Sequence, residues 1–359
     1  MTKMTNKNRE VSLAGAALRD YLDYSFEPRL YDLIEAWLMA SHTTSEGIPL
    51  FRNFVAFPTL LMEQWVSTGK TQTMKVCERL VPKGKLASYM TGPVMRDLVD
   101  EGYTLFCDDF HKIDGMVATV LKSGYQTGIS EHKKIYDREN KEWVNKDCDI
   151  YGPKMVSTNK PLPYEVVDRM LRLPTYGTAK KMPQVDPSDP MWGKAREDIA
   201  TRVVGCWKDI LSEYNRFNAT AGKTKLIGRE IELWKPLIAI SRATGLGVES
   251  LAEDMVKDTR ARKSGESPEY MLLAWLEKEI AKPDYKSGYR YLSNDMDNGV
   301  RSMLDSAQLS FWDGTQPGNV LARLLPYPQG FKRFKATDKG RLYYTDKDTI
   351  RKAREVRPL

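Results

Sequence analysis

The stretch FPTLLMEQWVSTGKTQTMKVCERLV, from Phe57 to Val81, joins an apolar run to a helical pattern through a short polar loop. Gly69-Lys70-Thr71 ends that loop in the same way as the phosphate-binding pattern G-x-x-x-x-G-K-[ST]. The first glycine of the pattern, which serves a tight backbone turn, is replaced here by Gln64. Because the lysine and the hydroxyl remain, we expect a strand, a phosphate-binding loop and a helix.

In such a unit the loop N–H groups and the positive end of the helix dipole face the phosphates of a nucleotide. Lys70 would reach the β- and γ-phosphates of ATP, and the Thr71 hydroxyl would ligate Mg²⁺. The predicted nucleotide contacts in this segment are Ser67, Thr68, Gly69, Lys70, Thr71 and Gln72. A lone Gly-Lys-Thr is common by chance, so the prediction depends on the segments that follow it.

Two later apolar runs end in polar side chains. TLFCDDF ends in Asp108 and Asp109, of which one would hold the metal with its water shell and the other would activate the attacking water. KMVSTNKP supplies Asn159, which would hold that water near the γ-phosphate. The aspartates would equally well cap a helix, and Asn159 would suit a turn before Pro161. The joint order and spacing of these groups favour the nucleotide site.

An arginine follows in VDRMLRL, where Arg169 comes directly after Asp168. At this place an arginine would stabilise charge on a phosphoryl group bound by a neighbouring subunit. The alternative is an ion pair with a nearby acid on a helix. The predicted catalytic residues are Lys70, Asp108, Asp109, Asn159 and Arg169, and the predicted metal ligands are Thr71 and Asp108.

Composition limits the other function classes. The 359 residues are 41% hydrophobic, and there is no run of about 18 apolar residues to cross a membrane. The polar start MTKMTNKNRE predicts no signal peptide, and we expect a cytoplasmic protein. Four scattered cysteines without a C-x-x-C, and three dispersed histidines, argue against a zinc site.

The net charge of +7 is concentrated near the C-terminus. Residues 331–359 hold ten Lys or Arg against four acids. A basic segment on an otherwise near-neutral chain predicts an acidic polymer as partner. A solvated basic tail is the alternative.

Strand-like and helix-like segments alternate from residue 51 to 182, which predicts a largely parallel sheet covered by helices. The run FRNFVAFPTLLMEQ has strand character, with Pro58 as an interruption. HKKIYDRENKEWVNK predicts a β-hairpin that carries Tyr136 and Trp143. After the linker KKMPQVDPSDP, residues 191–282 have a helical pattern.

The succession of VSTGKTQTMKVCERLVPKGKLASYM, TLFCDDFHKI, VLKSGYQTG, GPKMVSTNKPLPYEVVDRMLRL and GREIELWKPLIAISRATG resembles a known family. It is similar to the P-loop helicase-type ATPases of plasmids, phages and integrated elements, which are akin to superfamily 3 and AAA+ helicases and often fused to a primase. The resemblance covers roughly residues 30–285. It implies an α/β fold with an AAA+-like parallel sheet. The implied regions are an N-terminal helical segment (1–50), a P-loop ATPase core (51–182), a helical lid domain (183–285) and a winged-helix-like basic domain (286–359).

The resemblance also implies individual roles. Lys70-Thr71 matches the Walker A lysine and hydroxyl, and Asp108-Asp109 matches the Walker B pair, which is usually Asp-Glu. Asn159 matches the sensor residue, and Arg169 the trans-acting arginine finger. Arg229 falls where the lid offers a second sensor arginine to the nucleotide, although it would also suit a helix surface.

DNA is the polymer that the resemblance implies, either single- or double-stranded. In related hexameric rings the hairpin lines a central channel, where lysines contact phosphates and aromatic rings stack on bases. The alternatives are a hairpin whose rings pack on the body, and a winged helix that binds protein. The predicted DNA contacts are Lys122, Lys133, Lys134, Lys141 and Trp143 around the hairpin, with Tyr136 as a second ring, and Lys332, Arg333, Lys335, Lys339 and Arg341 in the C-terminal region.

The implied function is an ATP-dependent DNA helicase or translocase. It would act as a hexameric ring in replication of a phage or plasmid element in a prokaryotic host, with a primase on a separate chain. Gln64 and the short Asp109 favour an alternative, a nucleotide-gated DNA-bound scaffold or helicase loader with little hydrolysis. A DNA-binding regulator with a relic ATPase domain is the third reading.

Overall fold

The computed structural model divides into two compact units, Met1–Asp254 and Met255–Leu359, and each is described by itself. The boundary between them lies inside the region predicted as a helical lid, and the four-part division of the chain stays a prediction. The described residues are 11–25, 27–63, 68–110, 113–159, 162–175, 180–220, 224–266, 268–281, 290–304, 312, 317, 332–337 and 340–344.

A five-stranded sheet forms the centre of the first unit, and every neighbouring pair in it is parallel. β3 and β6 are buried along their whole length, as the continuous apolar runs of strands covered on both faces require. This confirms the predicted parallel sheet. In spatial order the strands are β2 (Gly84–Ala87), β3 (Thr104–Cys107), β6 (Lys154–Thr158), β1 (Thr59–Glu63) and β7 (Met170–Arg172).

β1 is shorter than the apolar run that contains it. Leu50–Asn53 forms a 3₁₀ turn, and the strand begins only at Thr59, after Pro58. Proline has no N–H to donate to a neighbouring strand. The Pro58 carbonyl accepts a hydrogen bond from the Trp37 indole at 3.0 Å instead. The prediction of strand structure before Pro58 is therefore wrong.

Helices cover both faces of this sheet. Side chains alternate between the two faces of a strand. On β3, Leu105 and Cys107 pack in a core with α4 and α5, whereas Phe106 contacts Trp37 of α2 edge-to-face, with 6.1 Å between ring centroids. The helices of the first unit are α1 (Leu13–Tyr21), α2 (Arg29–Ala40), α3 (Lys70–Leu80), α4 (Gly92–Asp100), α5 (Gly115–Ser123), α6 (Tyr164–Val167), α7 (Met191–Thr220) and α8 (Arg229–Thr244); α9 (Val248–Glu266) begins in it.

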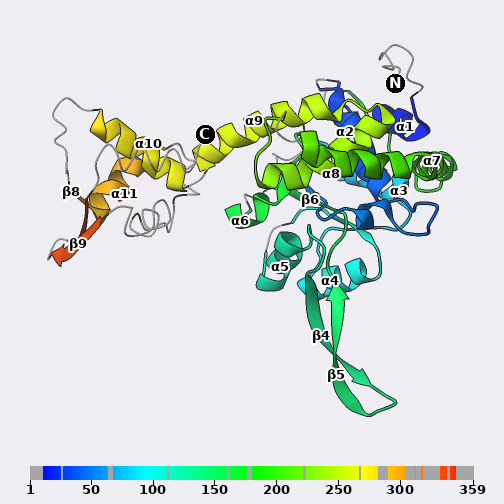
Figure 1. The fold of residues 1–359 in the computed structure, drawn as a ribbon, viewed down its shortest axis with the longest axis horizontal. Coiled ribbons are helices and arrows are strands. Elements are labelled where there is room, and N and C mark those ends of the chain that lie inside the picture. Colours follow the sequence, from blue (N-terminus) through cyan, green and yellow to red (C-terminus); the bar gives the residue numbers. More distant parts are fainter. Residues whose placement is uncertain are drawn as a thin grey trace. The chain divides into compact units, whose positions relative to one another are not determined.

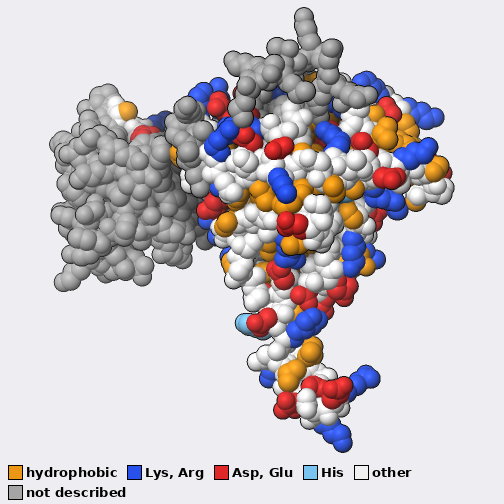
Figure 2. All heavy atoms as spheres, turned by 45° about the vertical axis from the view of Figure 1, so that its right-hand side comes forward, with side chains coloured by type: hydrophobic (Ala, Val, Ile, Leu, Met, Phe, Trp, Pro, Cys, Tyr) orange, Lys and Arg blue, Asp and Glu red, His pale blue; other side chains and the backbone are white. Residues whose placement is uncertain are grey.

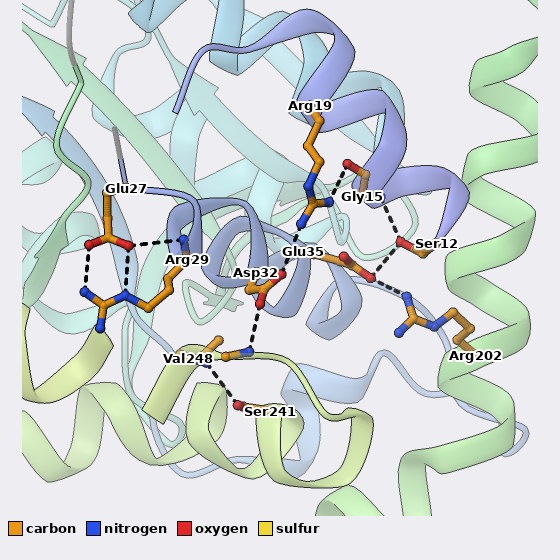
Figure 3. A network of polar contacts seen from close by, with 11 residues as sticks. Ser12, Gly15, Arg19, Glu27, Arg29, Asp32, Glu35, Arg202, Ser241 and Val248 are labelled. Carbon is orange, nitrogen blue, oxygen red and sulfur yellow. Dashed lines mark hydrogen bonds and ion pairs between the residues drawn. The ribbon is translucent and has the colours of Figure 1, made fainter. Parts of the chain in front are cut away.

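Polar contacts tie the N-terminal helices to later helices of the same unit (Figure 3). The buried Glu35 carboxylate accepts hydrogen bonds from the Ser12 hydroxyl, at 2.8 Å, and from Arg202 of α7. Asp32 accepts from the Gly247 N–H, at 2.8 Å, in the turn between α8 and α9. The N-terminal helical segment is thus packed into the unit that contains the sheet.

The predicted hairpin is confirmed. β4 (Ser130–Asp137) and β5 (Glu142–Asp149) pair antiparallel over eight residue pairs, with Tyr136 opposite Trp143, and they project from the body as a two-stranded arm (Figure 1). Two lysines fasten the arm to α4, since Lys133 pairs with Asp97 at 3.0 Å and Lys146 with Asp100 at 2.7 Å.

A fully buried lysine joins the base of this arm to the sheet. Lys154, the first residue of β6, donates hydrogen bonds to the carbonyls of Gly124, Ile150 and Gly152, each at 2.9 Å. Gly124 ends α5, and the other two carbonyls follow β5. Gly124 must lack a side chain, because a Cβ there would lie 2.3 Å from the Ile150 carbonyl oxygen.

The second unit holds α10 (Pro268–Ile280), β8 (Arg290–Leu292), α11 (Ser293–Arg301), β9 (Lys332–Thr337) and β10 (Gly340–Tyr344). Its three strands pair antiparallel in the order β8-β10-β9. Most of the region from 305 to 331 lies outside the described residues, so the winged helix stays a prediction. Among the described helices, none combines the length and apolarity that a bilayer crossing needs.

Candidate functional site

The end of the loop after β1 has the backbone that phosphate binding requires. Gly69 directly precedes α3 with φ +80°, a left-handed conformation that a side chain would strain. Lys70 and Thr71 are therefore the first two residues of the helix, where unpaired N–H groups favour anions. Residues 64–67, which include Gln64 and the predicted contact Ser67, lie outside the described residues.

Lys70 points to the carboxyl end of the neighbouring strand β6. Its side chain is nearly buried, and Nζ donates a hydrogen bond to Asn159 Oδ1 at 2.6 Å. Burial lowers the pKa of Lys70, and the nearby charges of Asp108 and Asp109 oppose that shift. The ammonium group therefore lies in a negatively charged setting beside the N-terminus of α3.

Asn159 links the lysine to the second aspartate. While Oδ1 accepts from Lys70, Nδ2 donates to Asp109 Oδ1 at 2.8 Å, so the two contacts fix which way the amide faces. Asp109 itself has a left-handed backbone, with φ +54°. Few non-glycine residues adopt this conformation, and they concentrate at functional sites.

The first aspartate is held from two sides. Asp108 Oδ2 accepts from the Thr71 hydroxyl at 2.7 Å, and Asp108 Oδ1 accepts from the Ser157 hydroxyl at 2.6 Å. Ser157 also accepts the Asp109 N–H at 2.9 Å. Ser157 is not among the predicted site residues, and its one signal in the sequence is its place in the Ser-Thr-Asn at the end of the apolar run.

This pair of oxygens fits a magnesium ion that also binds phosphate. Cis ligands of octahedral Mg²⁺ with bonds of 2.0–2.1 Å stand about 2.9 Å apart, and Thr71 Oγ1 and Asp108 Oδ2 are 2.7 Å apart. No group of three His, Cys, Asp or Glu able to hold a metal occurs among the described residues. Mg²⁺ is usually held by one or two carboxylates together with substrate phosphates, and Asp108 supplies one carboxylate here.

A cavity of about 270 Å³ adjoins the loop. Thr68, Gly69 and Gln72 form one wall, and residues 21–24 and 180–184 form the others. The Gln72 amide donates to the Pro183 carbonyl at 2.8 Å, which closes the wall at that point. Sequence reasoning predicted the first wall alone, because the other two come from segments some 50 and 110 residues away.

The two predicted arginines lie elsewhere. Arg169 directly precedes β7, whose first residue Met170 pairs with Thr59 at the amino end of β1. β1 rises by about 13 Å from Thr59 to its carboxyl end at Glu63. Arg169 therefore lies at the amino ends of the strands, whereas the loop lies at their carboxyl ends. Its guanidinium donates to the Glu165 carbonyl there.

Arg229 starts α8 and forms an ion pair with Asp168, the residue beside Arg169. Burial lowers the pKa of Arg229, but the Asp168 charge and Tyr125 raise it by more, so the net shift of that pKa is upward. Within this chain the structure does not bring Arg229 to Lys70, and its nucleotide contact stays a prediction.

The hairpin exposes its two aromatic rings. Trp143 is 68% exposed and Tyr136 49% exposed, and their centroids are 5.5 Å apart, so the rings pack on each other and not on the body. Figure 2 shows hydrophobic side chains between charged ones along this arm. Lys134 and Lys141 are also exposed.

The other predicted DNA contacts have different positions. Lys133 is paired with Asp97, and Lys122 lies in the last turn of α5. In the second unit Lys332, Arg333 and Lys335 are on β9 and Arg341 on β10; their side chains, and Lys339, lie outside what the structure describes.

Comparison with solved structures gives a weak likeness. No protein-family model and no curated protein matches the chain. Solved structures that match include the SCCmec type IV Cch active helicase, with 9% sequence identity and a TM-score of 0.44, over 95% of this chain and 71% of that one. A TM-score below 0.5 does not establish a common fold.

Proposed function

We propose that this chain is an Mg²⁺-dependent ATPase that works on DNA as a helicase or translocase. One observation carries the ATPase part: Lys70, Asp108, Asp109 and Asn159 meet beside the N-terminus of α3, at the carboxyl ends of β3 and β6. Ligands of open parallel sheets bind at that edge.

The side chains there have separable tasks. Lys70 neutralises phosphate charge, and the Gly69 turn lets backbone N–H groups approach the phosphates. Thr71 and Asp108 hold Mg²⁺, which offsets the charge that develops on the phosphate oxygens. Asp109 accepts the proton of the attacking water, and Asn159 keeps that carboxylate aimed by its 2.8 Å hydrogen bond.

The cavity beside the loop suits the base of the nucleotide. It adjoins the phosphate-binding segment directly, and Tyr21 and Tyr24 belong to its walls. The Tyr24 hydroxyl lies 3.3 Å from the Thr73 hydroxyl of α3. A base held there leaves the phosphates at Gly69 and Lys70.

Arg169 serves a second copy of the chain. It lies at the amino ends of the strands, whereas Lys70 lies at their carboxyl ends. Arg169 therefore contacts the nucleotide of a neighbouring subunit, across an interface between the two. Repetition of that interface generates a closed ring, and we take a hexamer as its form. Mixing Lys70→Ala with Arg169→Ala tests this, because each is inactive alone whereas mixed rings contain complete sites.

The hairpin contacts the DNA strand. Its exposed rings offer stacking surfaces, and Lys134 and Lys141 offer phosphate contacts. Trp143→Ala then weakens single-strand binding about 5- to 150-fold, which corresponds to 1–3 kcal/mol for a stacked base. Tyr89→Ala is the matched control, because Tyr89 is a similarly exposed ring outside the hairpin, at 65%.

The first experiment is steady-state ATP hydrolysis with and without single-stranded DNA. Lys70→Ala removes the phosphate contact, and Lys75→Ala, an exposed lysine on the same helix, is the control. DNA-stimulated turnover that only Lys70→Ala abolishes supports the motor. Tight ATP binding without turnover would favour a nucleotide-gated scaffold or loader over the motor, and the short Asp109 side chain favours that alternative as well. No detectable ATP binding overturns both.

A further inference from the structure

A buried hydroxyl lies between the two aspartates of the site. Ser157 is completely buried on β6, and its oxygen is used twice. It accepts the Asp109 N–H at 2.9 Å and donates its own proton to Asp108 Oδ1 at 2.6 Å. An oxygen that must accept from one neighbour and donate to the other is supplied by a hydroxyl, and neither alanine nor valine replaces it.

These two bonds decide which way Asp108 faces. With Oδ1 bound to Ser157, the carboxylate presents Oδ2 to Thr71 Oγ1, 2.7 Å away. The hydrogen bonds run in one direction, from the Asp109 N–H through Ser157 to Asp108. Without the bond to Ser157, the Thr71 hydroxyl would be the one remaining contact of these two, and one hydrogen bond fixes the rotation of the carboxylate less well than two.

The same residue supports the unusual backbone of Asp109. A left-handed backbone at a non-glycine residue persists where its surroundings fix it. Ser157 fixes the N–H of Asp109, and Asn159, which follows directly after the end of β6, fixes its carboxylate. The carboxyl end of β6 and the residue after it therefore position both aspartates.

We propose that Ser157 is a positioning residue for the metal, which holds Asp108 in the orientation that binds Mg²⁺ with the nucleotide. The proposal rests on the proposed ATPase function and adds to it the element that controls metal affinity. Residues that orient a metal ligand typically change metal affinity or activity 10- to 100-fold when they are removed.

The test is nucleotide binding, so that it does not depend on turnover. A fluorescent ATP analogue is titrated into wild type and Ser157→Ala, in excess EDTA and at a series of Mg²⁺ concentrations. Mg²⁺ should strengthen binding of the analogue, and we expect the Mg²⁺ concentration that gives half of this effect to be about 10- to 100-fold higher in Ser157→Ala. Affinity in EDTA should change by less than about 3-fold, since Lys70 and Gly69 are untouched.

A matched control and a rescue separate positioning from folding. Thr158→Val removes the next hydroxyl on the same strand, which is equally buried and donates to the Phe110 carbonyl at 2.9 Å. It should leave the Mg²⁺ dependence at the wild-type value. Ser157→Thr keeps the hydroxyl and should recover most of the metal dependence.

A second pair of variants makes the inference refutable even if Ser157→Ala is less stable. In an Asp108→Ala background, Ser157→Ala should cause no further change in Mg²⁺ dependence, because its action passes through Asp108. If Ser157→Ala changes the Mg²⁺ dependence as much in the Asp108→Ala background as in the wild type, the inference about Ser157 is overturned. It is overturned equally if Ser157→Ala has the Mg²⁺ dependence of the wild type. Neither result bears on the proposed ATPase function. Wild-type protein that does not bind the analogue at any Mg²⁺ concentration overturns the ATPase proposal itself.

Discussion

Replacement of Lys154 by methionine should remove a pH dependence from the stability of the first unit. The Lys154 ammonium is completely buried, and three backbone carbonyls are its hydrogen-bond partners. Burial lowers its pKa from 10.5 to about 7. Methionine has a similar length and carries no charge at any pH, so it tests the charge with little change in volume.

The two pKa values set the sign and the size of the effect. Between pH 7 and 10.5 the unfolded chain binds more protons at this residue than the folded chain, so stability rises with pH and is lost as pH falls. Since one pKa unit corresponds to 1.36 kcal/mol, Lys154 makes the wild type about 3 kcal/mol more stable at pH 9.5 than at pH 7.

Other groups titrate in the same range. Burial raises the pKa of the Cys77 thiol, and it raises the pKa of Cys107 to about 12, so both thiols oppose the lysine as pH rises. The quantity to measure is therefore the stability gap, defined as the free energy of unfolding of the wild type minus that of Lys154→Met. Both proteins contain the same thiols. The Lys154 charge lowers the Cys107 pKa in part, but without that charge the pKa is higher still, so Cys107 stays protonated in both folded proteins below pH 9.5 and the contribution of the thiols cancels in the difference.

The assay is urea-induced unfolding followed by circular dichroism at several pH values from 7 to 9.5. We expect the gap to be about 3 kcal/mol larger at pH 9.5 than at pH 7. Lys85→Met, at an exposed lysine on β2, is the control and should show a constant gap. A gap for Lys154→Met that does not change with pH would show that this ammonium stays charged in the folded protein, and would refute the reasoning.

Three further outcomes follow from the same structure. Burial lowers the pKa of His42 to about 4, so the unfolded chain takes up this proton first as pH falls, and the wild type loses about 3 kcal/mol of stability between pH 6.5 and 4. His42→Gln should remove that loss, measured as the change in urea midpoint with pH. Gly69→Ala should weaken ATP binding about 5- to 30-fold in equilibrium titration, since an alanine at φ +80° costs about 1–2 kcal/mol in the conformation that faces the phosphates. Asn159→Ala should lower the turnover number about 100-fold and change ATP affinity much less, because it releases Asp109 from its 2.8 Å hydrogen bond; an equal loss in affinity and turnover would contradict that role.

Local sequence patterns were sufficient for the centre of the site. An apolar run, a Gly-Lys-Thr and a helical pattern predict β1, the loop and α3 without reference to the rest of the chain. Asp108, Asp109 and Asn159 could be placed near them because the carboxyl ends of parallel strands meet at one edge of a sheet. The hairpin was predictable for a similar reason, since its two strands are adjacent in the sequence.

Contacts between distant segments were not predictable in this way. The role of Ser157 depends on the pairing of β3 with β6 and on the left-handed backbone of Asp109, and neither leaves a mark in a single sequence. The ion pair between Arg229 and Asp168 is another such contact, since the two residues are 61 positions apart in the sequence. Pro58 lies inside the apolar run that has strand character, and the strand begins directly after it, because proline has no N–H for a neighbouring strand.

The arm formed by β4 and β5 also has a mechanical consequence. Eight residue pairs give it a length of about 27 Å. Its base is bound to Lys154 at one end of β6, and Asn159 lies just beyond the other end of the same short strand. A lever of that length turns a rotation of about 7° into a displacement of 3.4 Å at its tip, the spacing of consecutive bases in a strand. In the proposed translocase, a rotation of that size at the base of the arm would therefore be enough to move its tip by the length of one base.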